Sequence, residues 1–387
     1  MIILGGVSLS RRAGSQGGAR AEEVGLAQVQ GIPSASRHPR QIVTIVGARP
    51  QFVKAFPLSR EFRLHDAFDE ILVHTGQHFD WNMSDVFFAE LGLEAPRYNL
   101  NIHGGSHGTM TGRMLHAIEE IVNSERPAGV LVYGDTNSTL AGALAAAKCG
   151  VPVIHIEAGL RSYNRRMPEE VNRVVVDHLS SFLLCPTLRA VGNLTREGIT
   201  SGVHRVGDLM FDAVKIATPL ATQHSGILER LGLRERSYAV ATFHRQENLA
   251  NRSRMAAIVT YLRDQSQAMP LIVPLHPRTR DALENASLDF GSDAITTIAP
   301  LGYLDMCLLV HAAAMVFTDS GGLQREAYFH RVPCVTLRDE TEWVETVECG
   351  WNRFWTSADF LPRREIPELE KENTAEAIFH LLDRELA

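Results

Sequence analysis

The chain has 387 residues, which allows two domains of ordinary size, and its 45% hydrophobic and 21% charged residues are typical of a packed globular protein. This composition excludes a disordered or fibrous chain, and short apolar runs such as Val151–Ile156 exclude a membrane-spanning helix. The net charge of -7 argues against general nucleic-acid binding, which needs a basic surface, but is compatible with a small phosphorylated ligand.

Residues 1–40 are rich in Gly, Ser, Ala and Arg, and we predict a flexible extension there. From Gln41 onward, short Val/Ile/Leu runs alternate with longer amphipathic stretches, which is typical of βαβ units and a parallel sheet. The strands predicted in this first half are 42–46, 70–74, 129–133, 153–156 and 182–185. The predicted helices are 50–63, 83–91, 108–124, 138–148, 168–180 and 188–197.

The alternation starts again after Gly207-Asp208. The strands predicted in the second half are 238–242, 271–274, 294–298, 314–318 and 333–336. The predicted helices are 252–265, 279–285, 304–312 and 323–330, and a last helix at 374–386. We therefore predict an α/β fold of two Rossmann-like, doubly wound domains, 41–206 and 207–373, that face a central cleft, followed by a C-terminal segment, 374–387.

The five cysteines are scattered, with no Cys-x-x-Cys pair and no histidines at zinc spacing. We expect buried free thiols, no metal site and a cytoplasmic protein. No Gly-x-Gly-x-x-Gly motif follows the first predicted strand, so a nicotinamide mechanism is unsupported and we expect no cofactor.

Two strand ends in the first half present charged groups after a glycine. Gly47 follows the first strand and leads to Arg49 and Lys54, which would place two cations at the expected cleft, although solvated charges of an ordinary turn explain them equally well. Gly134-Asp135 follows the strand 129–133. Asp135 is either the N-cap of the next helix or a carboxylate directed at a substrate.

The densest motif extends from His155 to Arg173. Glu157 comes directly after the apolar strand 153–156, and a loop leads to a helix with Glu169 in its first turn. Glu169 and Arg173 are four residues apart, so a surface ion pair on one helix face explains them well. That interpretation does not explain Glu157, whose position favours a functional role.

Three strand ends of the second half suit a phosphorylated ligand. His244 opens a polar run after the strand 238–242, and His276 follows the strand 271–274, where it either builds a turn or contacts a ligand. Ser320-Gly321-Gly322 lies between a strand and a helix, where bare backbone N–H groups favour a diphosphate. Glu326, one turn later, is within reach of a ribose hydroxyl. The charged run after strand 333–336, taken alone, is explained as a solvated surface loop. Charged or glycine-rich loops recur, however, after strands of both halves, and this recurrence predicts one site between the domains.

Together these motifs resemble the non-hydrolysing UDP-N-acetylglucosamine 2-epimerases, from about Ile42 to Trp351. The motifs that carry the resemblance are Gly-Ala-Arg-Pro at 47–50, Gly-Asp-Thr at 134–136, His-Ile-Glu-Ala-Gly-Leu-Arg at 155–161, Pro-Glu-Glu-x-Asn-Arg at 168–173, His-Arg-x-Glu-Asn at 244–248 and Asp-Ser-Gly-Gly at 319–322.

The resemblance implies a fold similar to GT-B glycosyltransferases, with the last helix crossing back to the N-terminal domain. It also implies that UDP-N-acetylglucosamine and UDP-N-acetylmannosamine interconvert by UDP elimination to a 2-acetamidoglucal and re-addition, and it suggests a homodimer. The expected catalytic residues are Asp135, Glu157, Glu169, Arg173 and His244. The expected substrate-binding residues are Arg49, Lys54, His276, Ser320, Gly321, Gly322, Glu326 and Arg338.

The chain departs from the family pattern at a few positions. Gln51 stands where members commonly have Glu, and Trp343-Val344 replaces Arg-Pro. The loop between Arg161 and Pro168 is also shortened. These variants are similar to the branch acting on UDP-2,3-diacetamido-2,3-dideoxyglucuronic acid, which is the first alternative function; a GT-B glycosyltransferase is the second.

Overall fold

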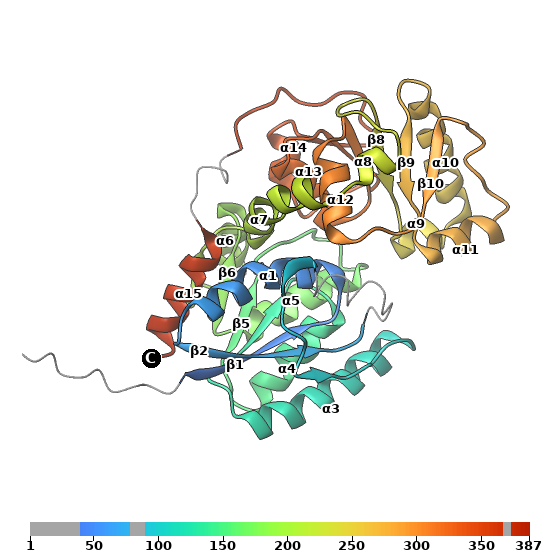
Figure 1. Cartoon of the computed structure of the whole chain (residues 1–387). Helices are drawn as coiled ribbons and strands as arrows, with labels where there is room; N and C mark the ends of the chain where they lie inside the picture. Colours follow the sequence, from blue (N-terminus) through green and yellow to red (C-terminus); the bar gives the residue numbers. More distant parts are fainter. Residues whose placement is uncertain (1–38, 78–89, 367–372) are drawn as a thin grey trace, which may run out of the picture. The chain divides into compact units, whose positions relative to one another are not determined.

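A computed structural model describes residues 39–77, 90–366 and 373–387, all of which belong to one structural unit (Figure 1). The predicted extension 1–40 and the predicted helix 83–91 lie outside the described residues, apart from the last two residues of each.

In the first half of the described chain, seven parallel strands form one sheet in the order β3-β2-β1-β4-β5-β6-β7. The strands are β1 (Arg40–Val46), β2 (Phe68–His74), β3 (Tyr98–Asn99), β4 (Gly129–Tyr133), β5 (Val153–Ile156), β6 (Phe182–Cys185) and β7 (Val203–Arg205). The helices are α1 (Arg49–Leu64), α3 (His107–Glu125), α4 (Asn137–Lys148), α5 (Pro168–Leu179) and α6 (Leu188–Arg196).

In the second half of the described chain, six parallel strands form another sheet in the order β10-β9-β8-β11-β12-β13. The strands are β8 (Ala239–Thr242), β9 (Leu271–Pro274), β10 (Ile295–Ile298), β11 (Met315–Thr318), β12 (Cys334–Thr336) and β13 (Asn352–Phe354). The helices are α7 (Leu209–His224), α8 (Ile227–Arg230), α9 (Gln246–Leu249), α10 (Arg252–Ser266), α11 (Pro277–Asn285), α12 (Tyr303–His311), α13 (Gly321–Phe329), α14 (Val344–Glu348) and α15 (Thr374–Glu385).

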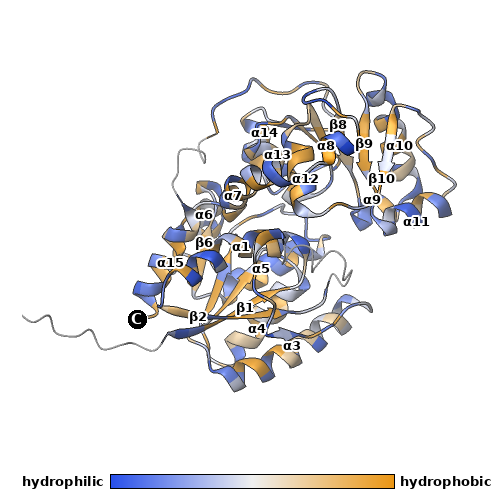
Figure 2. Ribbon diagram, viewed as in Figure 1, coloured by the Kyte–Doolittle hydropathy of each residue, from blue (hydrophilic) through white to orange (hydrophobic). Residues whose placement is uncertain are grey.

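Both sheets are covered on two faces, which confirms the predicted doubly wound α/β architecture. On β1, Ile42 and Val46 belong to one apolar cluster, whereas the alternating Val43 and Ile45 belong to another. Because successive strand residues point to opposite faces, a strand with an apolar residue at nearly every position must be buried on both sides. Most of the strands are accordingly orange along much of their length in Figure 2.

The carboxyl ends of the central strands define where ligands of such sheets bind. In the first sheet the strand order reverses between β1 and β4, and in the second between β8 and β11. Ligands of open α/β sheets bind at this reversal point, outside the carboxyl ends of the strands. The segments that follow these four strands begin at Gly47, Gly134, Phe243 and Asp319, which are the motifs predicted to carry the chemistry.

Helix α7 has no counterpart among the predicted elements. The predicted elements within the described residues are all present, with ends shifted by no more than two residues. Pro219 lies inside α7, and its Ala/Thr-rich sequence gives little amphipathic contrast, so the helical pattern is weak. The helix packs against α1 of the first half and against α12 and α13 of the second. One apolar cluster therefore runs from Val46 through Ala213 to Val240.

The short strands β3, β7 and β13 and the short helices α8, α9 and α14 were also not predicted, because a run of two to five residues carries almost no periodic signal. The prediction of buried thiols is right for Cys185, Cys307 and Cys334, whereas Cys149 and Cys349 are partly exposed. None of the described helices combines the length and the apolar character needed to cross a membrane.

Helix α15 packs against α1 and β2 of the first half. Phe379, 3% exposed, meets Phe68 edge-on with the ring centroids 5.8 Å apart, and stacks on His65 at 4.3 Å. At the same helix, Arg40 of β1 forms an ion pair with Asp383. The predicted domain boundaries at 206/207 and 373/374 stay a proposal.

Replacing Phe379 by alanine is expected to destabilise the protein by about 3–5 kcal/mol, because the truncation leaves a cavity between α15, α1 and β2. Urea unfolding followed by tryptophan fluorescence measures the change. His380→Ala on the exposed side of the same helix is the matched control and should change the stability by less than about 0.5 kcal/mol. Equal effects of the two substitutions would contradict this packing.

Candidate active site

Gln51 fixes the turn between β1 and α1. Its Oε1 accepts hydrogen bonds from the backbone N–H groups of Gly47 (2.8 Å) and Ala48 (3.0 Å). Its Nε2 donates to the carbonyl of Tyr133 (2.8 Å) and to the Thr139 hydroxyl (3.0 Å). Only an amide both accepts and donates in this way, so Gln51 ties the ends of β1 and β4 together where an ionised glutamate would face the Tyr133 carbonyl unfavourably.

Lys54 and Glu157 form a buried ion pair at the end of the first sheet. Burial alone would lower the pKa of Lys54, but the Glu157 carboxylate outweighs it, so the pKa is raised. Burial raises the pKa of Glu157, and the Lys54 ammonium offsets only part of that rise. Lys54 also feels the charges of Asp208 and, more weakly, of Asp135, so three carboxylates act on the same cation.

The backbone at Glu157 is in the left-handed region, with φ of 71°. A non-glycine residue there is strained by about 1–2 kcal/mol. Opposite it, Gly134 has φ of 62°, and a Cβ at this position would lie 3.2 Å from Glu157 Oε2. The glycine therefore makes room for the carboxylate, which pairs with Lys54 from this left-handed backbone position.

Asp135 is held by Arg173 of α5. Arg173 Nε and Nη2 lie 2.9 Å and 2.8 Å from Asp135 Oδ2, and Arg173 Nη1 donates to Glu170 at 2.5 Å. The interpretation of Asp135 as a helix cap is wrong, because Thr136 caps α4. The predicted surface pair of Glu169 with Arg173 is also wrong: Arg173 is 2% exposed, and its carboxylate partners are Asp135 and Glu170.

Glu169 instead acts electrostatically on Arg245, a cation from the second half of the chain. Arg245 lies 4.0 Å from Glu342 Oε1 and also feels the charges of Glu169 and Asp135. Burial alone would lower the pKa of Arg245, but these carboxylates raise it. Its Nη1 atom is buried and has no acceptor within the described residues, which leaves a donor for a ligand.

His244 follows β8, and its backbone N–H donates to both Asp319 oxygens at 3.1 Å and 3.0 Å. Its imidazole Nδ1 lies 3.7 Å from Asp319 Oδ1, and the side chain is 49% exposed. Asp319, fully buried, also accepts from the N–H of Arg245 and from Asn248 Nδ2. The carboxylate after β11 thus holds the loop after β8.

Ser320 caps α13, and its hydroxyl accepts a hydrogen bond from Leu323 N–H at 3.4 Å. The first N–H groups of this helix belong to Gly321 and Gly322, which are donors for an anion. A Cβ on Gly321 would lie 2.4 Å from Glu342 Oε1, so a larger residue here would displace the Glu342 carboxylate.

Arg49, which follows β1, interacts electrostatically with Glu326 of α13 in the second half of the chain. Burial raises the pKa of Glu326 to about 7, although Arg49 and Lys54 oppose this rise. Burial lowers the pKa of Arg49, and Glu326 is the largest charge that opposes this change. Arg49 Nη1 also donates to the Leu301 carbonyl at 3.3 Å.

Arg338 and His276 each contact one of the residues described above. Arg338 Nη1 donates to Glu342 Oε2 at 2.9 Å, and its Nη2 lies 3.8 Å from Met167 Sδ. The His276 ring lies 6.4 Å from the His244 ring, and its Nδ1 accepts the Arg278 N–H at 3.2 Å. His276 therefore caps α11, as the turn-building interpretation predicted.

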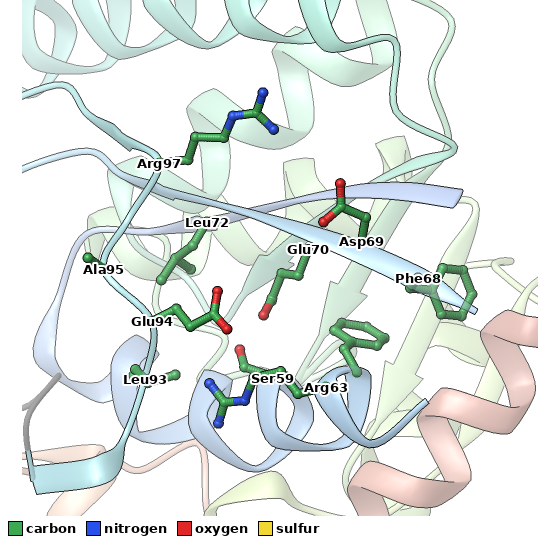
Figure 3. Close-up of a pocket in the computed structure, with 11 residues that line it drawn as sticks. Ser59, Arg63, Phe68, Asp69, Glu70, Leu72, Leu93, Glu94, Ala95 and Arg97 are labelled. Atoms are coloured by element: carbon green, nitrogen blue, oxygen red, sulfur yellow. The ribbon is translucent and has the colours of Figure 1, made fainter. Parts of the chain in front are cut away.

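The structure connects most predicted site residues through these contacts, whereas the ligand contact expected of His276 stays a prediction. Sequence reasoning did not assign roles to Gln51, Arg245, Asp319 and Glu342. Asp319 carried a usable signal, since it is a carboxylate directly after an apolar strand, as Glu157 is. A pocket of about 300 Å³ lies elsewhere, between α1 and the amino-terminal part of β2, with Ser59, Arg63 and Glu70 in its lining (Figure 3).

Comparison with known proteins agrees with the family resemblance of the motifs. The sequence model of one family, described as UDP-N-acetylglucosamine 2-epimerase, matches residues 60–363. The chain belongs to the UDP-N-acetylglucosamine 2-epimerase family. It is therefore an isomerase of the UDP-sugar 2-epimerase class, and the family resemblance seen in the motifs is confirmed.

Two curated relatives and one solved structure illustrate the relationship. The chain is 50% identical over 316 residues to the UDP-2,3-diacetamido-2,3-dideoxy-D-glucuronate 2-epimerase of Pseudomonas aeruginosa, covering 81% of this chain and 87% of that one. It is 43% identical over 320 residues to a UDP-N-acetylglucosamine 2-epimerase of Methanococcus maripaludis, with the same coverage. The Methanocaldococcus jannaschii UDP-GlcNAc 2-epimerase, crystallised with UDP-GlcNAc and UDP, superposes with a TM-score of 0.82 at 37% identity over 89% of this chain and 99% of that one.

Replacing Lys54 by methionine should raise the pKa of Glu157 further, because burial remains while the offsetting cation is lost. A carboxylate that must be ionised to accept a proton loses activity below its pKa. The acidic limb of the pH–activity profile should therefore move to higher pH by about 1–3 pH units. Lys148→Met, at an exposed lysine in α4, is the control and should leave the profile in place. An unmoved acidic limb in the Lys54 variant would show that Glu157 does not depend on this cation.

Proposed function

We propose that this chain inverts C2 of a UDP-2-acetamido sugar by eliminating UDP and adding it back, without net hydrolysis. The observation that carries the proposal is the ion pair of Glu157 with Lys54 at the end of the first sheet, with Asp135 after the neighbouring strand β4 and within electrostatic reach of the same cation. Carboxylates held at one point near a cation suit proton transfer at a carbon.

The chemistry must begin at the anomeric carbon, because the C2–H of an acetamido sugar has no adjacent carbonyl and is not acidic. When the C1–O bond breaks, its electron pair leaves with the diphosphate and C1 becomes cationic. The C2–H bond then breaks, its electrons form the C1=C2 double bond, and a carboxylate keeps the proton. Returning a proton to the opposite face of C2 while UDP adds to C1 gives the epimer, so atoms and electrons balance.

The leaving diphosphate needs donors that stabilise its developing charge. We assign this role to His244, Arg49, Lys54 and the N–H groups of Gly321 and Gly322. The half-exposed imidazole of His244 supports the assignment, as does the position of the glycines at the start of α13. Ser320 fixes that helix start, and Glu326 is assigned to the ribose hydroxyls.

The proton transfers at C2 are assigned to Asp135, Glu157 and Glu169. Arg173 orients Asp135 through an Nε hydrogen bond and an Nη2 ion-pair contact to the same carboxylate oxygen, which limits the directions in which the other oxygen can point. Glu169 is linked electrostatically to Arg245 of the second half. These charges belong to one coupled set, so their titrations should be measured together. Arg338 is assigned to binding the sugar, because it lies beside Met167, which directly precedes the helix that carries Glu169.

UDP-N-acetylglucosamine is the first proposed substrate, by the family description. The second candidate is UDP-2,3-diacetamido-2,3-dideoxyglucuronate, which the 50% identity to the Pseudomonas aeruginosa enzyme favours. The glycosyltransferase alternative is set aside, since the comparison with a glucosyltransferase at 11% identity reflects the fold alone.

Incubating the wild-type protein with each UDP-sugar in deuterium oxide tests the proposal. We expect one deuteron at C2 of the product and of recovered substrate with at least one of the two compounds, detected by NMR. Release of free sugar would indicate hydrolysis instead. Conversion without label at C2 would contradict the proposed reaction.

Glu157→Gln should lower C2 exchange by about 10²–10⁴-fold, because the amide cannot take the proton. UDP binding, measured by calorimetry, should stay within about twofold, since the UDP-binding groups come mainly from the other sheet. Glu120→Gln at an exposed position of α3 is the matched control and should behave as wild type. Normal exchange in the Glu157 variant would refute its assignment.

The homodimer suggested by the family resemblance and the cytoplasmic location expected from the cysteine pattern stay predictions. Sedimentation of the purified protein at micromolar concentration tests the first.

A further inference from the structure

His155 is a buried histidine in the middle of a core strand. It is the third residue of β5, is 0% exposed, and pairs in register with Val132 of β4. A polar ring in such a place must have its polar atoms satisfied. Its Nδ1 lies 2.7 Å from Asp177 Oδ1, and its Nε2 lies 2.8 Å from the Gly134 carbonyl oxygen.

Both partners of the ring are acceptors. Asp177 is ionised, since its carboxylate forms an ion pair with Arg161, whose Nη1 lies 2.7 Å from Oδ2, and also accepts from the Gly159 N–H at 3.1 Å. Burial alone would raise the pKa of Asp177, but the hydrogen bonds and charges of His155 and Arg161 lower it. Because a carboxylate and a carbonyl both require a donor, each nitrogen of His155 carries a proton and the ring is an imidazolium.

A buried ion pair of this kind commonly gives little net stability compared with apolar side chains of the same volume. Stability alone therefore does not account for the pair Asp177–His155. What the pair does supply is a directional hydrogen bond to a single backbone carbonyl, that of Gly134.

The Gly134 carbonyl belongs to the peptide unit whose nitrogen is that of Asp135. The opposite side of Asp135 is also held, because Asn172 Nδ2 of α5 donates to the Asp135 carbonyl at 2.8 Å. Gly134 also lies against the Glu157 carboxylate. A shift of this one peptide would therefore displace Asp135 and crowd Glu157.

We propose that His155 is a positioning residue for the epimerisation: held by Asp177, it donates to the Gly134 carbonyl and so fixes the spacing of the Asp135 and Glu157 carboxylates. The inference rests on the proposed function. A displacement near 1 Å in a catalytic group can reduce a rate by about 10²-fold. Because elimination and proton return need different alignments, loosening the peptide should let the glycal and UDP escape before the epimer forms.

Three variants separate positioning from a general structural role. In His155→Gln, the amide nitrogen can face Gly134, but the amide oxygen then faces the Asp177 carboxylate. In Asp177→Asn alone, the amide nitrogen or oxygen faces a ring that has lost its counter-charge. In the double variant, the asparagine amide introduced at position 177 donates to the side-chain oxygen of the glutamine introduced at position 155. The nitrogen of that glutamine then donates to the Gly134 carbonyl, which restores every hydrogen bond of the ring without charge.

The readout is the ratio of released glycal to epimer, which does not depend on the fraction of folded protein. We expect each single variant to raise this ratio at least about tenfold and to lower kcat about 10–100-fold, with KM and UDP binding within about twofold. The double variant should return the ratio to within about threefold of wild type. Glu197→Gln, which removes the bidentate partner of Arg161 but no bond to Gly134, is the control and should leave the ratio unchanged.

Unchanged ratios in both single variants, with activity falling only as the folded fraction falls, would overturn the positioning role while leaving the proposed function intact. A wild-type protein that forms neither epimer nor glycal from either UDP-sugar would overturn the proposed function, and this inference with it. If the single variants do not fold, the ¹⁵N signals of the His155 ring in the wild-type protein decide the matter: two protonated nitrogens are expected, and a neutral ring would overturn the proposal.

Discussion

The ion pair between Lys54 and Glu157 is the constraint on which the arrangement depends. A carboxylate buried at the end of a core strand is costly unless a cation compensates it, and Lys54 reaches it from the first turns of α1. The left-handed backbone at Glu157 and the missing side chain at Gly134 both serve this approach. The pair explains why one of only four lysines in the chain lies inside the protein.

Around this pair, arginines and carboxylates from both halves of the chain interact with one another. Arg173 of the first half feels the charge of Glu342, and Arg245 of the second half feels those of Glu169 and Asp135. The apolar cluster that includes α7 connects the two sheets behind these charges. A nucleotide sugar fits this division, since its diphosphate suits the donors of α13 and its hexose suits the carboxylates of the first sheet.

The sequence predicts the alternating elements well, because apolar periodicity reports directly on burial in a parallel sheet. It fails at α7, where Pro219 and small residues weaken the pattern although the helix is central to the core. At the site, the strand ends locate Asp135 and Glu157, and helical spacing could have given the Glu170 partner of Arg173 but not its other partner. Its carboxylate partner Asp135 lies on a different element, and only the folded chain brings the two together.

The central claim is that UDP leaves the anomeric carbon before C2 is inverted. The most direct test uses a UDP-sugar carrying ¹⁸O only in the oxygen that bridges C1 and the β-phosphorus. If elimination occurs, rotation of the freed β-phosphate should scramble the label into non-bridging positions of recovered substrate during epimerisation. Epimer formation with the label still confined to the bridging position would contradict the account.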